Sequence, residues 1–587
     1  MSKIFEFMTP YIGFILITIA LIFVEAMCAL FLPGLMADIV NDGVLPGYLP
    51  VIWSTGFTML ALTVLSMVMA IGAGFFIAKT SAGLAHDLRE AVFTKVLGFS
   101  KAEVGKFSTS SLITRTTNDI TQVQDTLMMA LRLFIYAPII GVGGIMRALD
   151  RSGSMTWIVA VASIAMVVSM GILFTVVLPK FNRLQGLIDR LNLVSRENLS
   201  GILVVRAFST QKFEKDRFDV ANKELADTSR FIDTSFAFMM PAIMLIMNLT
   251  TTIIVWVGAR HVSEFSIDIG DIFAFLQYGM LIIFSFLMVS IMMVYLPRMV
   301  VSANRIKEVL ESESSMEIKS DPIRLPKDFK GIIEFRSVDF RYPDALETDD
   351  NVLTDISFTA KPGETTAIIG ATGEGKTTVL QLLLRFYDVT GGGIFVDGLN
   401  IKDIHKEDLH SNIGYIPQKS LLFTGDIQSN LIYADKEASQ ETIDKAVEIS
   451  QSKAFIEDKP EKYESSVAQG GSNFSGGQRQ RLSIARALVK DTQVYLFDDS
   501  FSALDVKTDA QLRDALKKQT GNSTMIVVAQ RITSIMDAEQ IVVLDQGHVV
   551  GKGTHKELMK DCKVYQEIAA SQLSEEEANQ SRAGTLN

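Results

Sequence analysis

Glycine, lysine and threonine have a spacing that suits phosphate binding in TTAIIGATGEGKTTVLQLLLRF, residues 365–386. The pattern GxxxxGKT lies between a segment typical of a strand and a segment typical of a helix. Backbone N–H groups can wrap around phosphates at the glycines, namely Gly370, Gly373 and Gly375. Lys376 would reach the β- and γ-phosphates, and Thr377 would bind Mg²⁺. The stretch therefore predicts a site for ATP and Mg²⁺.

Two other residues are suited to complete such a site. Asp498 ends the apolar segment VYLF, a position from which a carboxylate holds Mg²⁺, usually through water. Tyr342, in VDFRYP, is an aromatic residue that could stack on adenine. The alternative for Tyr342 is a tyrosine on the surface of a strand without a ligand.

A second phosphate-binding surface is predicted in NFSGGQRQRLSIARAL, residues 473–488. A turn of small residues precedes a helix that carries arginines, and the turn consists of Ser475, Gly476, Gly477 and Gln478. Its backbone N–H groups and the Ser475 hydroxyl can bind phosphate. One chain does not need two such surfaces for one ATP. The economical interpretation is that each surface faces a different ATP across a dimer.

The overall composition indicates which kinds of domain position these residues. The chain has 587 residues, too many for one ordinary domain. Hydrophobic residues make up 48%, and the mean hydropathy is +0.28, with the excess in the first half. The net charge of −11 argues against nucleic acid as a partner. We therefore expect a membrane portion followed by a soluble one.

Six segments are long and apolar enough to span a bilayer, which takes roughly 20 residues as helix. They are residues 11–36, 52–78, 130–149, 155–178, 236–262 and 272–296. The short connections between them contain one basic residue, Arg151, whereas the long connections 79–129 and 180–235 contain six and ten. The positive-inside rule then places the long connections and both termini in the cytoplasm. The long connections have helical apolar spacing, so the spans are expected to continue into the cytoplasm.

The composition changes after the last span. Residues 1–310 are expected to form the membrane domain, and the polar, proline-containing residues 311–330 a linker. Strand-like and helical segments alternate in 331–572, which predicts an α/β domain. The acidic tail 573–587 is expected to be disordered.

Together these features resemble a half-transporter of the ABC exporter family over nearly the whole chain. The motifs are the six spans, Tyr342, GATGEGKTT, the loop GYIPQ, FSGGQ, LFDD and SALD. The expected fold is an α-helical six-span transmembrane domain with long cytoplasmic helix extensions, followed by an α/β P-loop ATP-binding cassette domain. The resemblance adds further residues to the nucleotide site: Thr378, Asp505, and Gln418 as a ligand of Mg²⁺. Residues 109–123 and 204–218 resemble the two cytoplasmic coupling regions of the family. The resemblance implies two chains facing head to tail, with ATP between the P-loop of one chain and the SGGQ of the other.

Two positions depart from the family pattern. Asp499 replaces the glutamate that polarises the attacking water, and its side chain is shorter by one methylene. Gln530 replaces a histidine that contacts the γ-phosphate, and glutamine cannot become cationic. We expect this site to bind ATP and hydrolyse it poorly, while the intact FSGGQ completes a catalytic site on a different chain. A heterodimer is therefore favoured, and the alternative is a homodimeric lipid or peptide exporter.

The expected function is ATP-driven export of lipophilic or amphipathic compounds across a bacterial plasma membrane. Drugs are one candidate class of such compounds. Glu25 lies within the first span, where a carboxylate tends to face a cavity or a partner. It is a candidate for contact with a cationic amphiphile or with protons. The alternative is a structural hydrogen bond or a position near a water-filled vestibule. An ATP-gated channel is a less favoured alternative, because we see no continuous row of charged residues along the spans. An ATP-sensing regulator without transport is a further alternative, which ATP hydrolysis that no lipophilic compound stimulates would indicate.

Overall fold

The computed structural model describes residues 2–316, 319, 321–326, 328–345 and 350–572. The predicted disordered tail, 573–587, and four residues of the predicted linker lie outside the described residues. The chain divides into two compact units. The first unit consists of Met1–Leu97 and Thr109–Ser312, and the second of Gly98–Ser108 and Glu313–Asn587. This division lies two residues from the predicted boundary at 310. It differs from the prediction in assigning Gly98–Ser108 to the second unit.

The first unit is helical throughout its regular structure. Within the described residues, six helical stretches are long and apolar enough to cross a membrane: Ile4–Val44, Leu49–Leu97, Thr109–Arg151, Gly153–Ser200, Gln211–Ser263 and Ile269–Glu311. Their elements are α1 (Ser2–Met8), α2 (Ile12–Asp38), α3 (Leu49–Leu97), α5 (Thr109–Thr114), α6 (Ile120–Arg151), α7 (Gly153–Ser200), α8 (Ile202–Ala207), α9 (Gln211–Ser263) and α10 (Ile269–Glu311). Two π-helical segments interrupt them, η2 (Ile39–Val44) and η3 (Arg115–Asp119).

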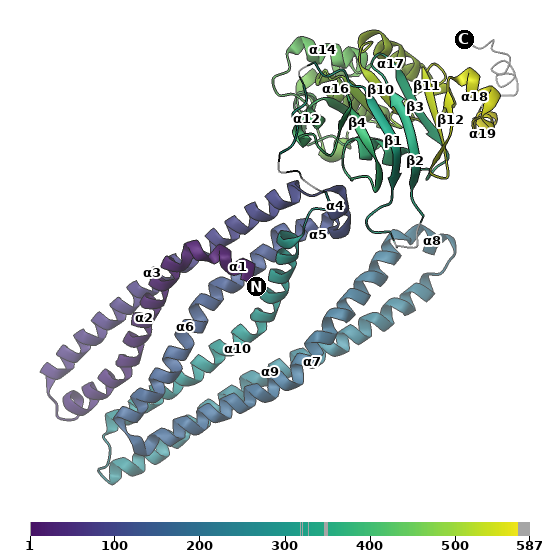
Figure 1. Cartoon of the computed structure of the whole chain (residues 1–587). Coiled ribbons are helices and arrows are strands. Elements are labelled where there is room, and N and C mark those ends of the chain that lie inside the picture. Colours follow the sequence, from purple (N-terminus) through teal and green to yellow (C-terminus); the bar gives the residue numbers. More distant parts are fainter. Residues whose placement is uncertain (1, 317–318, 320, 327, 346–349, 573–587) are drawn as a thin grey trace. The chain divides into compact units, whose positions relative to one another are not determined.

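These helices are much longer than a bilayer is thick. The α9 helix has 53 residues, which at 1.5 Å per residue is about 80 Å, against a hydrocarbon core of about 30 Å. Each of the six stretches therefore has room for a span and an extension beyond it. Figure 1 shows the helices running in pairs, and the contacts are densest between α2 and α3, α6 and α10, and α7 and α9.

Small residues allow close packing where α6 meets α2 and α10. A Cβ atom on Gly144 would lie 2.7 Å from Cγ1 of Ile282 on α10, closer than side-chain atoms can pack. A Cβ on the adjacent Gly143 would collide with Leu30 on α2. Glycine at these positions therefore lets the three helices approach. Tyr278 fixes the same region, since its hydroxyl donates to the Leu30 carbonyl at 3.3 Å.

The second unit contains two main sheets. One is antiparallel in the order β2-β1-β4-β5, formed by β1 (Ile333–Phe340), β2 (Leu353–Ala360), β4 (Gly391–Val396) and β5 (Leu399–Asn400). The other has the order β12-β11-β3-β10-β9-β6, with β3 (Thr365–Gly370), β6 (Ile413–Ile416), β9 (Val494–Asp498), β10 (Thr524–Val528), β11 (Gln540–Asp545) and β12 (His548–Gly553). All pairs in it are parallel except that of β11 with β12.

The register of the parallel sheet positions the predicted nucleotide residues. The β10 strand pairs with β3 on one side and β9 on the other, so that Val528 lies opposite both Ile368 and Asp498. The carboxyl ends of β3 and β9 therefore flank the end of β10. In α/β sheets, ligands bind at this edge. Helix α11 (Lys376–Leu383) begins just after β3 at the same edge.

Candidate functional site

The loop between β3 and α11 has the backbone that the glycine pattern predicts. Gly373 and Gly375 have φ angles of 98° and 83°, a region that only glycine adopts without strain. A Cβ atom on Gly375 would also lie 2.6 Å from Cδ2 of Leu353. Gly375 precedes the first residue of α11, so backbone N–H groups without intrahelical partners open onto the loop. This is a cradle for an anionic group.

Lys376 lies within this cradle. Its buried ammonium donates to the carbonyl of Gly370 at 2.8 Å and to that of Ala371 at 2.5 Å. Burial lowers the pKa of Lys376 below its usual value, although the neighbouring carboxylates oppose the shift. A phosphate is a stronger partner for an ammonium than a neutral carbonyl. The residues around Lys376 therefore fit a polyphosphate.

The hydroxyl and carboxylate predicted to bind Mg²⁺ are in direct contact. Thr377 Oγ1 donates to Asp498 Oδ1 at 2.8 Å, and the Tyr415 hydroxyl donates to Asp498 Oδ2 at 3.5 Å. Burial raises the pKa of Asp498, against the opposing effect of the Thr377 hydrogen bond. Hard oxygen ligands of this kind suit Mg²⁺. Thr377 and Asp498 thus fit the metal that accompanies a nucleotide.

The two residues that depart from the family pattern lie together. Burial raises the pKa of Asp499, while hydrogen bonds from Ser502, Gln418 and the backbone of Gln530 act against this shift. Gln418 Nε2 is 3.5 Å from Asp499 Oδ2, and Asp499 has a left-handed φ of 47°. The Gln530 side chain is exposed, and its backbone carbonyl accepts a hydrogen bond from the Gln572 side chain at 2.8 Å. At the end of β9, Asp499 therefore lies next to the Gln418 side chain and the backbone of Gln530.

Tyr342 lies beside the P-loop helix. Its hydroxyl is 2.8 Å from Thr378 Oγ1, and its ring packs edge-on against Phe340 and Tyr387. Burial raises the pKa of Tyr387 to about 12, so that ring stays uncharged. The contacts hold the Tyr342 ring in a defined orientation next to α11. Stacking of adenine on that ring remains a prediction.

The SGGQ turn forms the start of helix α16 (Gly476–Val489). Ser475 Oγ accepts from the Gln478 backbone at 3.3 Å, and Gln478 Oε1 accepts from the Ser475 backbone at 3.0 Å, a reciprocal capping box. Gly477 approaches the carbonyl of Ala503, while Gly476 has open space where a side chain would be. Among the described residues, no hydrogen bond joins this turn to the P-loop.

Asp505 has a structural role in the described chain. It caps helix α17 (Val506–Gln519) by accepting from the Thr508 backbone at 3.0 Å and the Thr508 hydroxyl at 2.7 Å. These hydrogen bonds lower the pKa of Asp505. The cap positions the turn from Ser502 to Asp505 next to Gly477. The placement of Asp505 in the nucleotide site therefore remains a prediction.

Sequence reasoning missed helix α4 (Lys101–Phe107), which packs within the second unit. Ser100 and Glu103 form a capping box, and Ala102 packs against the core that contains Tyr342. Lys101 is close enough to Asp498 for the two charges to interact. The signal was present in the sequence as S-x-x-E at residues 100–103, a pattern typical of a helix start.

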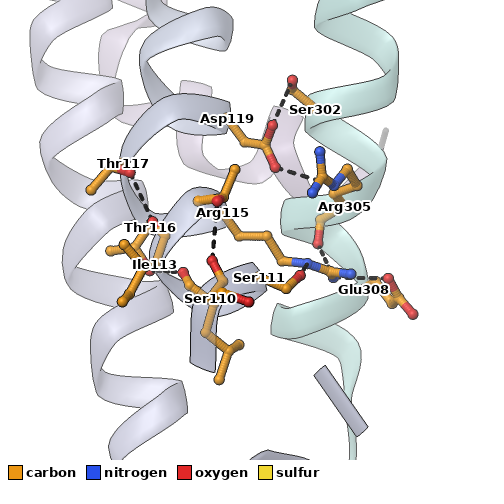
Figure 2. Close-up of polar contacts among 12 residues, drawn as sticks. Ser110, Ser111, Ile113, Arg115, Thr116, Thr117, Asp119, Ser302, Arg305 and Glu308 are labelled. Atoms are coloured by element: carbon orange, nitrogen blue, oxygen red, sulfur yellow. Dashed lines mark hydrogen bonds and ion pairs between the residues drawn. The ribbon is translucent and has the colours of Figure 1, made fainter. Parts of the chain in front are cut away.

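A cluster of charges lies in the first predicted coupling region, residues 109–123. Figure 2 shows Arg115 and Asp119 of η3 facing α10. Arg115 Nη1 donates to Glu308 Oε2 and to the Arg305 carbonyl, both at 2.8 Å. Asp119 accepts from Ser302 at 3.0 Å and lies 3.4 Å from Arg305 Nε. We call these residues the η3–α10 clasp: Arg115, Asp119, Ser302, Arg305 and Glu308. The clasp joins helix segments that are far apart in the sequence.

Glu25 lies far along the chain from the nucleotide residues and has its own partner. It is buried on α2, and its Oε1 accepts from Arg132 Nη2 of α6 at 3.1 Å. The structure therefore shows Glu25 in an ion pair within the helical unit. Contact between Glu25 and a substrate remains a prediction.

Comparison with known proteins covers both units. The family model for the ABC transporter transmembrane region matches residues 14–297, and the model described as ABC transporter matches residues 353–502. An uncharacterized ABC transporter ATP-binding protein of Mycobacterium tuberculosis is 39% identical over 96% of this chain and 96% of its own length. The uncharacterized YfiB of Bacillus subtilis is 37% identical, over 98% and 99%.

Two further similarities concern proteins with a more specific description. The ATP-dependent lipid A-core flippase of Pseudomonas aeruginosa is 29% identical over 98% of this chain and 96% of its own length. The ATP-bound structure of a bacterial Atm1-family ABC exporter superimposes with a TM-score of 0.77 at 23% identity, covering 95% of this chain and 98% of that one. At that identity the likeness is one of fold.

Proposed function

This chain belongs to the ABC transporters and carries both their transmembrane region and their ATP-hydrolysing domain, and from that premise we propose that it is one subunit of a heterodimeric exporter of lipophilic or amphipathic compounds. The observation that carries the heterodimer is the joint replacement of two hydrolytic residues, Asp499 and Gln530, beside an otherwise complete ATP site.

The proposed roles in ATP binding follow from the contacts at the end of the parallel sheet. Lys376 exchanges its two carbonyl partners for phosphate oxygens, and the backbone N–H groups at the start of α11 bind the same phosphates. Thr377 and Asp498 would hold Mg²⁺, which when bound would neutralise phosphate charge. Tyr342 supports the adenine ring from the side of α11. Gln418 links the metal side of the site to Asp499.

Hydrolysis at this site is proposed to be slow. The Asp499 carboxylate is one methylene shorter than that of glutamate, which moves it back from the attacking water by about 1 Å, and a misplacement of that size can cost about 10²-fold in rate. Gln530 offers a neutral amide where a cation would stabilise developing phosphate charge. The intact Ser475–Gln478 turn then serves the ATP of a partner that brings its own glutamate and histidine.

Two surfaces support the participation of a second chain. The SGGQ turn makes no hydrogen bond to the P-loop within the described residues, which is expected if it faces another molecule's ATP. The α8 helix and its flanks form the second predicted coupling region, and apolar side chains there are exposed, including Leu203 and Phe208 at 76% each. Side chains of this kind on a helix tip favour docking onto another protein surface.

The substrate class is proposed from the membrane portion and from the relatives. The chain is a multi-pass membrane protein with six apolar helical stretches in the described residues. A relative at 29% identity is described as a lipid A-core flippase, and its named substrate is amphipathic. An amphipathic substrate is consistent with the methionine- and phenylalanine-rich spans of this chain. The bacterial origin of the relatives supports a location in a bacterial plasma membrane. The distribution of lysine and arginine supports an orientation with the ATPase domain and both termini in the cytoplasm.

The proposed function is tested by isolating the tagged chain from its native membrane in mild detergent and identifying what accompanies it. We expect an equimolar second half-transporter with glutamate after its Mg²⁺-binding aspartate. The isolated complex should hydrolyse ATP, and lipophilic compounds should stimulate it. A pure homodimer with a normal rate of ATP hydrolysis would overturn the heterodimer and the slow site together.

A further inference from the structure

We propose that Arg132, oriented by Glu25, binds the anionic group of an amphiphilic substrate, a phosphate or a carboxylate. This inference deepens the proposed export function and rests on it. It concerns the helical unit alone, where α2 and α6 bring the two residues together across 107 positions of sequence. It differs from the prediction that Glu25 contacts a cationic substrate, because here the cation of the pair is the group that meets the ligand.

The two side chains differ strongly in their access to the surroundings. The Glu25 side chain is 9% exposed, whereas that of Arg132 is 45% exposed. Glu25 uses only Oε1 in the pair, and its buried Oε2 has no hydrogen-bond partner among the described residues. The carboxylate is therefore closed off from a ligand, and the guanidinium is the part that a ligand meets.

Two apolar clusters flank Glu25, one on each side of it along helix α2. Toward the start of α2, Ile22 packs with Ala73 and Ile77 of α3 and against Leu131 and Ile135 of α6. Toward its end, Ala26 and Leu30 pack with Ile140 of α6. Tyr136, one turn after Arg132, packs against both clusters and lies near both charges. A charged carboxylate in such surroundings requires a cation, which explains why the pair forms.

The pair presents a defined polarity to its surroundings. A buried negative end and an exposed positive end form a dipole, and the exposed end attracts anions. A guanidinium has five N–H donors, and a single hydrogen bond of Arg132 is found among the described residues, the one to Glu25. The remaining donors suit the bidentate recognition of phosphate or carboxylate.

The position of Arg132 along α6 suits an amphiphile. It lies two residues inside the predicted apolar span 130–149, next to the end that leads to the basic connection 79–129. An anion bound there would leave its apolar part among the span residues, whereas a soluble anion would have no such contacts.

The experiment measures binding to the complex as isolated from the native membrane. Dioctanoyl phosphatidate is titrated against dioctanoylglycerol, which has the same tails and no charge, and binding is followed by thermophoresis. We expect Arg132→Gln to weaken phosphatidate binding about tenfold or more, since it removes a charged hydrogen-bond donor, and to leave dioctanoylglycerol binding unchanged. Arg132→Lys should recover part of the loss, because it keeps the charge without the planar fork.

Two control variants separate ligand binding from a structural role. Arg147→Gln removes the same charge from the same helix, where Arg147 lies over the Phe31 ring at 3.9 Å, and should leave binding unchanged. Glu25→Gln keeps a side-chain oxygen that can accept from Arg132 and so orient it, but removes the negative charge that competes with a bound anion. It should therefore retain or strengthen phosphatidate binding. A purely structural ion pair predicts the opposite, namely that Glu25→Gln and Arg132→Gln weaken both lipids equally, and that result would overturn the proposal.

Inorganic phosphate as a competitor identifies the source of the anion. Displacement of phosphatidate by inorganic phosphate supports a site for free anions, and persistence of binding supports a lipid head group; both keep Arg132 as the anion site. ATP hydrolysis by the same samples distinguishes a failure of the Arg132 site from a failure of the proposed export function. A wild-type complex that hydrolyses ATP and responds to amphiphiles, with Arg132→Gln unaltered in binding, would overturn this site alone. A complex that responds to no amphiphile would overturn the proposed export function.

Discussion

The carboxylate of Glu103 accepts hydrogen bonds both from the start of helix α4 and from the chain that follows α10. Its Oε1 accepts from the backbone of Ser315 at 2.9 Å, and its Oε2 accepts from the backbone of Ser100 at 2.7 Å. The hydroxyls of Ser100 and Ser315 are also 3.0 Å apart. Both segments belong to the second unit, and in the sequence one follows helix α3 and the other follows helix α10. Glu103 therefore joins two segments of the second unit that are far apart in the sequence.

Replacing Glu103 with alanine should release α4 from that unit. The change removes two hydrogen bonds to backbone donors, which are worth about 1.5–3 kcal/mol each when the acceptor is charged. Amide hydrogen exchange of residues 100–107 should accelerate, and ATP hydrolysis should respond less to transported compounds. Unchanged exchange in Glu103→Ala would contradict this role.

The same contact should depend on pH in a predictable direction. Burial by itself raises the pKa of Glu103, but the hydrogen bonds from Ser100 and Ser315 outweigh it and hold the pKa below the usual 4.5. A carboxylate whose pKa is depressed by folding contributes stability that is fully present above pH 4.5 and is lost as the pH falls through the folded-state value. After correction for intrinsic rates, exchange of α4 amides should therefore be unchanged from pH 7 to 5 and should accelerate as the pH falls below 4.5.

Restoring both hydrolytic residues should increase turnover at this site. Asp499→Glu with Gln530→His should raise hydrolysis by up to about 10²-fold, because the carboxylate again reaches the attacking water and a cation can contact the γ-phosphate. The measurement uses complexes whose partner site is disabled at its P-loop lysine. Adding Asp498→Asn provides the silent control. Nucleotide binding without any gain in turnover would show that the cause of slow hydrolysis lies elsewhere.

Two variants of Tyr342 distinguish the contribution of ring stacking to ATP affinity from the contribution of its hydroxyl. Tyr342→Ala should weaken ATP binding by about 1–3 kcal/mol, the range for loss of a base-stacking aromatic. Tyr342→Phe removes only the 2.8 Å contact with Thr378 and should keep most of the affinity. The two variants can be compared with a fluorescent ATP analogue and a guanosine analogue. Equal losses in both variants would assign the role to the hydroxyl.

The η3–α10 clasp should contribute measurably to the stability of the helical unit. Arg115→Leu removes the side-chain donor that the Arg305 carbonyl and the Glu308 carboxylate share, and the Arg115 side chain is only 10% exposed. We expect a loss of about 1–3 kcal/mol, since Glu308 is half exposed and retains water. The matched control is Arg260→Leu, which breaks an exposed pair with Glu264 and should cost less than about 0.5 kcal/mol. Thermal unfolding in detergent compares the two, and equal shifts would show that the clasp adds nothing specific.

Local chemistry allowed the nucleotide site to be predicted from sequence. The P-loop needs glycine at positions such as Gly373 and Gly375, whose φ angles other residues avoid, so the requirement is visible in the residue types themselves. The membrane spans are visible for a similar reason, because a helix in lipid needs a continuous run of apolar residues. Both features depend on neighbours within a few turns of chain.

Pairing between distant residues was decided by the tertiary structure. Glu25 was recognised as an unusual charge, but its partner Arg132 lies 107 residues away and was not predicted. Glu103 and Ser315 are separated by 212 residues, and Arg115 and Glu308 by 193. Such pairs depend on which helix faces pack together, and helical periodicity identifies a face without naming the helix opposite it. For this reason the sequence was sufficient to predict the ATP site, while only the packing of the helices showed that Glu25 pairs with Arg132.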